Sequence, residues 1–408
     1  MARRWTLRLV AVAALGVMLY WHREASLTAS TFIFVCVAGF LLFILWMAGR
    51  QHDFSHLPVP EGRVVAVVPV FNEEPELLRA CLDSLVNQTH PLDAIYVVDD
   101  GSPTPAPVYR HPRVHWKRVR NGGKRRAQAA GLISEADRAD FIVTVDSDSV
   151  VAPDGVERLL RAFSDPRVYA ATGLPVLRNR THNLITRVTD MEMVYSCRVM
   201  RGARSAVGAV CPTSGAFSAY RAGVFYDNVQ DYLTSGTYSD DRRLTHYALA
   251  RGWVVSVDEA IVETHMPTTP RGVFRQRTRW FKGALKFLPW EVRHLRGAPL
   301  AFRLWNTSMF VLYPILIAHA MVITPLTGGS VDLSSLVYWL ILLYLQTAVY
   351  ITGRPGVPLV ERVLSWALLT PALSLFQLLL IRTALYWATT QVRSDSWATR
   401  GSAVQQPA

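Results

Sequence analysis

The segment Phe141-Ile-Val-Thr-Val145, followed at once by Asp146-Ser147-Asp148, decides the fold. An unbroken run of apolar and β-branched residues predicts a short strand buried on both faces, as in a parallel sheet covered by helices. Two similar runs come earlier, from Arg63 to Pro69 and from Ala94 to Val98. An amphipathic helical pattern follows the first of them, so the alternation predicts an α/β domain.

Acidic pairs follow two of these predicted strands. Asp99-Asp100-Gly101-Ser102 comes directly after the second run, as Asp146-Ser147-Asp148 does after the third. Ligands of open α/β sheets bind beyond the carboxyl ends of the strands. We therefore expect both acidic pairs to face one crevice.

The composition indicates a chain that is partly embedded in a membrane. Of its 408 residues, 50% are hydrophobic and 18% are charged, which fits neither a wholly soluble enzyme nor a protein lying entirely in lipid. The formal net charge of +12 suits nucleic acid, anionic lipid or an anionic small substrate. No nucleic-acid-binding motif occurs, so we expect phosphates of another kind and no nucleic-acid partner. The four cysteines lack paired ligand spacing, which predicts a reducing compartment without a zinc site or disulfide framework.

Apolar runs near the N-terminus predict a membrane hairpin. Residues 5–21 and Leu27 to Met47 are separated only by a short polar loop. A signal peptide is the alternative for the first run, but no small-residue cleavage site precedes the second. Two transmembrane helices therefore fit better. Basic residues before and after the pair place both ends in the cytoplasm.

The C-terminal part is predicted to return to the membrane. Trp305 to Pro325 and Leu333 to Thr352 are two further spans, whereas Pro371 and Arg382 interrupt the apolar run Val357 to Gln391. The predicted organisation begins with an N-terminal transmembrane hairpin (residues 1–50) and a cytoplasmic α/β domain (60–270). Interfacial amphipathic helices (271–300), a second transmembrane hairpin (301–353) and a C-terminal segment with a cytoplasmic tail (357–408) follow.

Asp146 and Asp148 have the spacing of a metal site. Two carboxylates just past a strand can bind a hard cation such as Mg²⁺ or Mn²⁺, which commonly bridges carboxylates to substrate phosphates. The alternative is a turn in which Asp148 or Ser149 caps a helix that begins near Pro153. The position after a buried strand favours the metal.

Two short segments carry groups suited to a nucleotide-sugar. Asn121-Gly-Gly-Lys124-Arg125-Arg126 combines paired glycines with cations that can neutralise a diphosphate, although it lacks the spacing of a Walker loop. A solvated basic turn is equally compatible with it. Thr213-Ser214-Gly215-Ala216-Phe217 suits close packing against a sugar, but a turn between strands would look the same.

Two further segments belong to predicted helices. Gln276, Arg279 and Trp280 share one helix face, which suits a phosphate and the apolar face of a sugar, or alternatively a helix at the membrane surface. Ser239-Asp240-Asp241-Arg242-Arg243 begins another helix. Its acids are either capping groups or a general base beside an anionic substrate.

In this order, the motifs resemble the membrane-embedded, inverting family-2 processive glycosyltransferases, specifically the hyaluronan synthase and chitin-oligosaccharide synthase branch, with cellulose synthase more distant. The matching pieces are Pro69-Val-Phe-Asn72-Glu73, Asp99-Asp100-Gly101-Ser102, Gly123-Lys124-Arg125, Asp146-Ser147-Asp148, Ser214-Gly215, Asp240-Asp241-Arg242, Gln276-x-x-Arg279-Trp280 and Trp397-Ala398-Thr399-Arg400. The resemblance covers roughly residues 60 to 400.

The resemblance implies a GT-A-type, Rossmann-like domain between N- and C-terminal transmembrane helices, and a role for each matching residue. Asp241, beside Asp240, would be the general base, and Asp148, supported by Asp146, would bind Mg²⁺ or Mn²⁺. The residues implied to bind donor or acceptor are Asp99, Asp100, Lys124, Arg125, Ser214, Gly215, Gln276, Arg279, Trp280, Trp397 and Arg400. If Trp397 and Arg400 reach the nucleotide, the run Val357 to Gln391 must dip in and return or form an interfacial helix after Pro371.

The resemblance further implies an enzyme of the cell membrane that polymerises UDP-sugars and exports the growing polysaccharide. A hyaluronan-like synthase using UDP-GlcNAc and UDP-glucuronate is preferred. A synthase of poly-GlcNAc, a single-transfer polyprenyl-phosphate glycosyltransferase and a silent sugar-binding or export component are the alternatives. Ser239 and Ala398 stand where hyaluronan synthases typically have Gly, and the residues after Trp280 lack their Ser-x-x-Arg-Glu pattern. These departures bear on the polymer, and leave the reaction class unchanged.

Overall fold

The computed structural model describes residues 9, 12–13, 29–133, 138–236, 239–318, 322–328 and 333–393. Its centre is an eight-stranded sheet with the order β3-β2-β1-β4-β7-β6-β8-β5. The strands are β1 (Val64–Val70), β2 (Ala94–Asp99), β3 (Val114–Arg118), β4 (Phe141–Val145), β5 (Val150–Val151), β6 (Val168–Leu177), β7 (Phe217–Arg221) and β8 (Trp253–Thr264). The α/β prediction is confirmed, and the three apolar runs are the neighbouring strands β2, β1 and β4.

Strands β1, β2, β3 and β4 are parallel, whereas β7 runs antiparallel between β4 and β6. In β1 the residues alternate between two cores: Val64, Ala66 and Val68 face one, and Val65 and Val67 face the other. Because both faces are covered, every residue of β1 is buried. This is the physical reason for the unbroken apolar runs.

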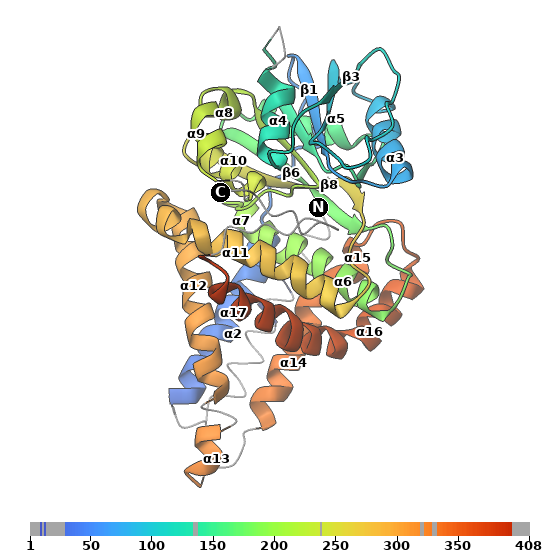
Figure 1. The fold of residues 1–408 in the computed structure, drawn as a ribbon. Helices are drawn as coiled ribbons and strands as arrows, with labels where there is room; N and C mark the ends of the chain where they lie inside the picture. Colours follow the sequence, from blue (N-terminus) through green and yellow to red (C-terminus); the bar gives the residue numbers. More distant parts are fainter. Residues whose placement is uncertain are drawn as a thin grey trace.

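Helices cover both faces of the sheet. Leu78, Cys81 and Leu82 of α3 (Pro75–Val86) and Leu159 of α5 (Gly155–Leu160) pack in the first core. The second core receives side chains from α4 (Lys124–Ile133), α8 (Gly223–Tyr226), α9 (Val229–Thr234) and α10 (Asp240–Leu249). Helices α4 and α10 begin near the carboxyl end of β4, because Lys124 at the start of α4 contacts Asp146 after that strand and Asp240 at the start of α10 (Figure 1).

A second layer of helices lies below the sheet in Figure 1. It contains α6 (Leu184–Tyr195), a π-helical segment (Ser196–Arg201), α7 (Gly202–Ser205) and the long α11 (Pro270–His294). From it, α2 (Ala29–Ala48), α12 (Gly297–Ala318) and α14 (Leu333–Thr347) extend away from the sheet, and the short helices α13 (Thr324–Leu326) and α15 (Val349–Gly353) complete this part. Ile44 and Leu45 of α2 pack with Val199, Ala203 and Val349, which fixes these helices to the layer.

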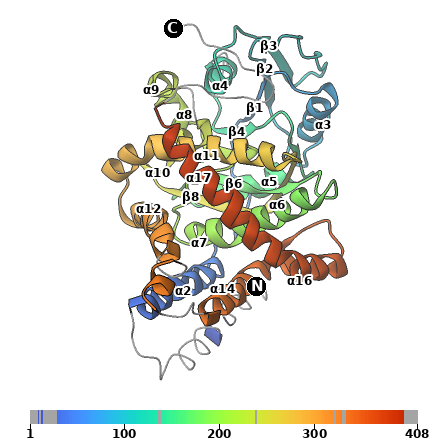
Figure 2. The same cartoon turned by 60° about the horizontal axis from the view of Figure 1, so that its bottom comes forward.

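The C-terminal run is one continuous helix, so the chain does not turn back within residues 357–391, and the alternative of an interfacial helix after Pro371 stays a prediction. It comprises α16 (Leu359–Leu375), a π-helical segment (Phe376–Ile381) and α17 (Arg382–Thr390), and α17 crosses α11 (Figure 2). Pro371 cannot donate to the carbonyl of Ala367, four residues earlier. The hydroxyl of Tyr344 on α14 donates to that carbonyl at 2.8 Å instead, and the helix passes through the proline.

Among the described residues, the helix Leu359–Thr390 is long and apolar enough to cross a membrane by length and composition. The helices α2, α12 and α14 overlap three other predicted spans, although α12 begins at Gly297, before the predicted start at Trp305. The first predicted span, residues 5–21, lies almost wholly outside the described residues, as do Trp397 and Arg400. The multi-pass arrangement and the domain limits stay predictions.

Candidate active site

A cavity of about 1680 Å³ opens at the carboxyl edge of β1 and β4 and continues between the helices of the second layer. The sequence-predicted residues that line it are Asp100, Lys124, Asp146, Asp148, Ser214, Gly215, Asp240, Asp241, Gln276, Arg279 and Trp280. Phe302, Trp305 and Asn306 of α12 and Leu342 and Gln346 of α14 line its other end. The fold thus brings most of the predicted site together and joins it to the helices that extend from the sheet.

Asp99 and Asp100 have different surroundings. Asp99 is buried behind the cavity wall and accepts a hydrogen bond from the Ser102 backbone at 2.9 Å, so it shapes its own turn. Asp100 accepts from the backbone N–H groups of Gly122 and Gly123, each at 2.8 Å. Burial raises the pKa of Asp100, against the effect of these two bonds. This carboxylate therefore anchors the glycine loop that precedes α4.

Lys124 and Arg125 also differ. The ammonium of Lys124 contacts Asp146 at 2.7 Å and Asp240 at 2.9 Å inside the cavity. The guanidinium of Arg125 is buried behind the wall and donates to the Gly236 carbonyl at 2.9 Å and to the Ser239 carbonyl at 3.3 Å. Arg125 thus supports the segment that leads into α10, a role the motif did not indicate because that segment is more than a hundred residues away in sequence.

The carboxylates of Asp146 and Asp148 fit a hard divalent cation. Asp148 is 7% exposed and lies 3.5 Å from the Thr264 hydroxyl. Glu73 adds a third carboxylate nearby, bound to the Ser147 hydroxyl at 2.8 Å. Oxygen donors of this kind are those that Mg²⁺ and Mn²⁺ prefer. The alternative in which Asp148 or Ser149 caps a helix is wrong, because α5 begins at Gly155 with Asp154 in the capping position.

Asp240 and Asp241 open α10 in a conformation that simple capping does not explain. Ser239, in the capping position, has a left-handed φ of 47° and makes no side-chain capping bond. Burial and the negative charge of Asp240 raise the pKa of Asp241 to about 6. Burial also acts on Asp240, but the ammonium of Lys124 prevails and lowers its pKa. Two neighbouring carboxyls with pKa values moved apart are typical of an acid–base site.

Ser214 and Gly215 form a wall of the cavity. The Ser214 N–H donates to the Thr172 hydroxyl at 2.9 Å, which fixes the loop before β7. A Cβ at Gly215 would lie 3.2 Å from the Lys124 Nζ and 3.4 Å from an Asp146 oxygen. A side chain here would crowd the ion pair, so the position favours glycine.

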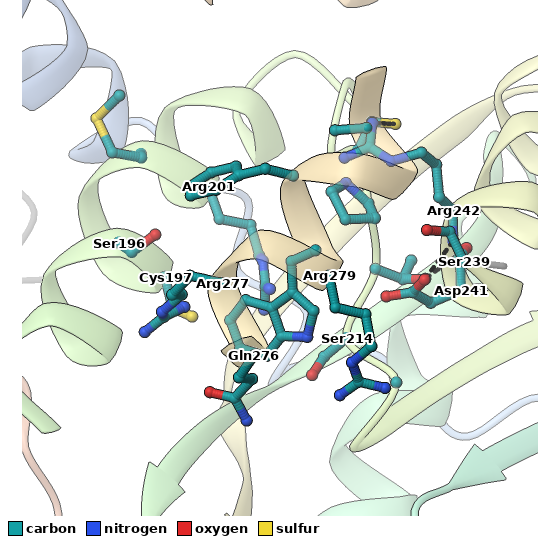
Figure 3. A pocket seen from close by; sticks show the side chains of 18 of the residues that line it. Ser196, Cys197, Arg201, Ser214, Ser239, Asp241, Arg242, Gln276, Arg277 and Arg279 are labelled. Carbon is teal, nitrogen blue, oxygen red and sulfur yellow. Dashed lines mark hydrogen bonds between the residues drawn. The ribbon is translucent and has the colours of Figure 1, made fainter. Parts of the chain in front are cut away.

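Helix α11 supplies the opposite wall, where Gln276, Arg279 and Trp280 line the cavity as the helical spacing predicted. Figure 3 shows Ser214, Asp241 and Arg279 approaching the same space from a loop, α10 and α11. Arg277 lies over the Trp280 ring at 4.4 Å and pairs with Glu192 of α6. Trp280 stays 38% exposed, so its ring is held in place and remains accessible.

Charged residues that no sequence motif indicated lie on the second-layer side of the cavity. Arg201, Arg204, Glu291 and Arg303 line it, and they come from four different elements or their ends. Glu291 is 1% exposed in a segment that otherwise looks like an interfacial helix. Nothing in the sequence distinguishes this acid from an exposed one, because its partners come from distant segments.

Acids at the ends of parallel strands, a glycine loop with Lys124 and a carboxyl whose pKa is raised form a site that suits a nucleotide-sugar. Residues 60–283 match the model of a family described as glycosyltransferase-like family 2, and the chain belongs to this family.

Relatives extend the similarity beyond the sheet. The hyaluronan synthase of Streptococcus pyogenes serotype M1 is 31% identical over 375 residues, which cover 86% of this chain and 84% of that protein. An N-acetylglucosaminyltransferase of Bradyrhizobium diazoefficiens is 35% identical over 247 residues, 56% of this chain and 50% of its own. An N-acetylglucosaminyltransferase from Neorhizobium galegae is 36% identical over 267 residues, which cover 60% of this chain and 61% of that protein. The similarity to hyaluronan synthase therefore extends beyond the residues that match the family model.

A solved structure supports the fold alone. The mannosyltransferase PcManGT from Pyrobaculum calidifontis, in complex with GDP-Man and Mn²⁺, superposes with a TM-score of 0.54 at 17% identity. The superposition covers 96% of this chain and 100% of the mannosyltransferase.

Proposed function

We propose that the protein is a membrane-embedded processive glycosyltransferase that polymerises UDP-sugars by inverting transfer and exports the polysaccharide, as a hyaluronan synthase does. The observation that carries this proposal is the continuity of the cavity. One space reaches from Asp100 and Asp241 at the sheet edge to Trp305 and Leu342 on helices that extend away from it. A product held there has a path from the reacting groups toward the membrane helices.

The reaction needs one base and no protein acid for the leaving group. Asp241 takes the proton of the acceptor hydroxyl as that oxygen attacks C1 of the donor sugar. The new C1–O bond forms while the bond from C1 to the UDP oxygen breaks, so the anomeric centre inverts. The cations of Lys124 and Arg279 lie in the cavity and stabilise the charge that develops on the departing UDP.

Asp148 and Asp146 would hold a divalent cation, Mg²⁺ or Mn²⁺, which neutralises the diphosphate when bound. Lys124 already contacts Asp146, and it would remain beside the diphosphate. Asp100 would orient the nucleotide through the loop it anchors, and Asp99 would act through the same turn. Arg125 would act by supporting the segment before Asp240. Trp280 would stack on the acceptor sugar, with Gln276 and Ser214 as polar neighbours.

The membrane arrangement is part of the proposal. The helix α16 exposes a row of large apolar side chains, including Leu359, Val360, Leu364, Leu368 and Leu375, each more than half exposed. Such a surface suits lipid rather than water. We expect the sheet domain in the cytoplasm of a multi-pass protein of the cell membrane, with α11 and α17 at the interface.

The test is product analysis with purified full-length protein in lipid vesicles. UDP-GlcNAc and UDP-glucuronate are supplied singly and together, with Mg²⁺ or Mn²⁺, and the products are sized and digested. We expect long polymer only when both donors are present. Polymer from UDP-GlcNAc alone would instead establish a poly-GlcNAc synthase, the second candidate favoured by the N-acetylglucosaminyltransferase relatives.

The same assay addresses the remaining alternatives. A single sugar on an added polyprenyl phosphate would indicate the single-transfer enzyme, and absence of UDP release with every donor would indicate a sugar-binding or export component. Asp241→Asn is the matched control, since it should retain UDP binding and lose transfer. Normal turnover in this variant would remove Asp241 as the base.

A further inference from the structure

Glu291 gathers three partners around one buried carboxylate near the end of α11. Its Oε1 accepts from Arg242 Nη1 at 2.7 Å and lies 3.0 Å from His246 Nε2. Its Oε2 lies 2.6 Å from Arg303 Nε. Burial opposes ionisation, yet the guanidinium of Arg242 and the other contacts hold the pKa of Glu291 well below its usual range. A charged carboxylate is therefore fixed where α10, α11 and α12 meet.

Arg242 connects this carboxylate to the proposed base. It is the residue after Asp241, and its backbone N–H donates to Asp241 Oδ1 at 2.7 Å. Its side chain runs the other way, away from the Asp241 carboxylate (Figure 3). It ends at Glu291, 49 residues further along the chain. The pairing with Glu291 thus fixes both the direction of the Arg242 side chain and the first turn of α10.

Removing the charge of Glu291 would leave two guanidiniums facing each other. Arg242 and Arg303 both bind this one carboxylate, and their side chains are only 12% and 15% exposed. Like charges with little access to water repel strongly. Arg242 would then be drawn to another carboxylate, and Asp241 is its neighbour in the chain. An ion pair there would occupy the group that must accept the proton.

We propose that Glu291 is a positioning residue for the transfer step: it holds the guanidinium of Arg242 away from Asp241 and keeps α10 in place against α11 and α12. This inference rests on the proposed role of Asp241 as base. Arg303 of α12 contacts Glu291 directly. The helix that lines the far end of the cavity is therefore connected to Asp241 through Glu291 and Arg242.

Metal binding does not explain the cluster. Ligand atoms of Cys211, His246 and Glu291 lie within 4.8 Å of one another, a spacing compatible with a metal ion. However, each oxygen of Glu291 already lies within 2.7 Å of a guanidinium nitrogen. A divalent cation would have to enter beside these two positive charges, which disfavours it. The cluster therefore acts through its ion pairs.

The test compares Glu291→Gln with the wild type as full-length protein in vesicles, with UDP release and UDP binding as readouts. We expect kcat to fall by about 10-fold to 100-fold, because small displacements of a catalytic group have effects of this size. The KM for the UDP-sugar should stay within about twofold, since the donor groups Asp100 and Lys124 lie on other elements. Glu157→Gln on α5, which breaks an ion pair with Arg161 just after that helix, is the matched control.

Two further variants separate positioning from folding. Glu291→Gln combined with Arg242→Met should regain part of the lost kcat, because the guanidinium that turns toward Asp241 is gone. Glu291→Asp keeps the charge and should fold with an intermediate kcat, so it provides the test if Glu291→Gln does not fold.

Unchanged kcat in Glu291→Gln would overturn the proposal, as would a loss of kcat that the double variant deepens. An equal fall of kcat in the control Glu157→Gln would also overturn the proposal, because the effect would then not be specific to Glu291. Absence of UDP release from the wild type counts against the proposed function instead, so the two failures are distinguishable.

Discussion

The ammonium of Lys124 contacts the carboxylate of Asp240 at 2.9 Å and so joins the glycine loop before α4 to the first turn of α10. The same ammonium contacts Asp146 at 2.7 Å. One cation from the glycine loop therefore holds together two carboxylates from two other segments, at the place proposed for the diphosphate.

Replacing Lys124 with Met should weaken donor binding more than it alters folding. A charge-assisted contact contributes about 1.5–3 kcal/mol, so we expect the KM for the UDP-sugar to rise by about tenfold or more. Initial rates of UDP release across a range of donor concentrations measure this. Lys117→Met, at the exposed end of the sheet, is the control. Equal KM values in the wild type and Lys124→Met would contradict a donor contact.

The pH dependence of turnover should follow Asp241. Burial and the charge of Asp240 raise its pKa to about 6, so the base is ionised and competent above this pH and protonated below it. We expect kcat/KM to fall about tenfold per pH unit on the acid side of pH 6.

Asp240→Asn removes the negative charge that raises the pKa of Asp241, so the acid limb should move to lower pH. Rates of UDP release between about pH 5 and pH 8 locate the limb in each variant. Asp227→Asn, which loses an exposed pair with Arg251, should leave the limb where it is. If Asp240→Asn left it in place as well, the charge of Asp240 would not control the base.

Ser239 has a backbone conformation that suits glycine. Its φ of 47° lies in the left-handed region, which glycine adopts at little cost and which a residue with a Cβ disfavours. The sequence marked Ser239 as a doubtful position because the family typically has Gly there. The structure shows a conformation that suits Gly, occupied by Ser.

Ser239→Gly should therefore stabilise the protein by about 1 kcal/mol and leave the product unchanged. The half-life of activity at elevated temperature measures the gain, and product digestion tests the polymer. Ser239→Ala keeps the Cβ and should give no such gain. A change of polymer in Ser239→Gly would instead make this position a determinant of the substrate.

Features set by residues close together in the sequence could be predicted, whereas contacts between distant segments could not. The strand Phe141–Val145 and the site at its end could be predicted, because burial on both faces leaves an unbroken apolar run and the acids follow it directly. Helix α11 could be predicted because Gln276, Arg279 and Trp280 share one face within a single turn. Each of these patterns is complete within a short segment, so a single sequence is enough to detect it.

The contacts that were missed join distant segments. Arg125 looks like part of a phosphate loop, and only the fold shows that it is buried under the segment before Asp240. Glu291 is one acid in an amphipathic helix until α10 and α12 bring Arg242 and Arg303 to it. Pro371 reads as a helix break, because nothing local reveals that Tyr344 replaces the missing donor.

Arg125 holds the segment before α10 in place. Its buried guanidinium donates to the Ser235 hydroxyl at 2.9 Å and to the carbonyls of Gly236 and Ser239, which lie just before α10. Arg125→Met would leave these acceptors without that donor, at a cost of about 1–3 kcal/mol for each one that stays buried. Both the thermal half-life and kcat should therefore fall.

Arg125→Lys should not restore either property, because one ammonium cannot reproduce the spread of a guanidinium over several acceptors. Arg158→Met, which loses an exposed pair with Asp154 on the far side of the sheet domain, controls for the removal of a positive charge. Thermal inactivation and UDP release measured on the same preparations decide the outcome. A variant at Arg125 that kept its stability but lost donor binding would show that this side chain contacts the nucleotide, as the resemblance implied.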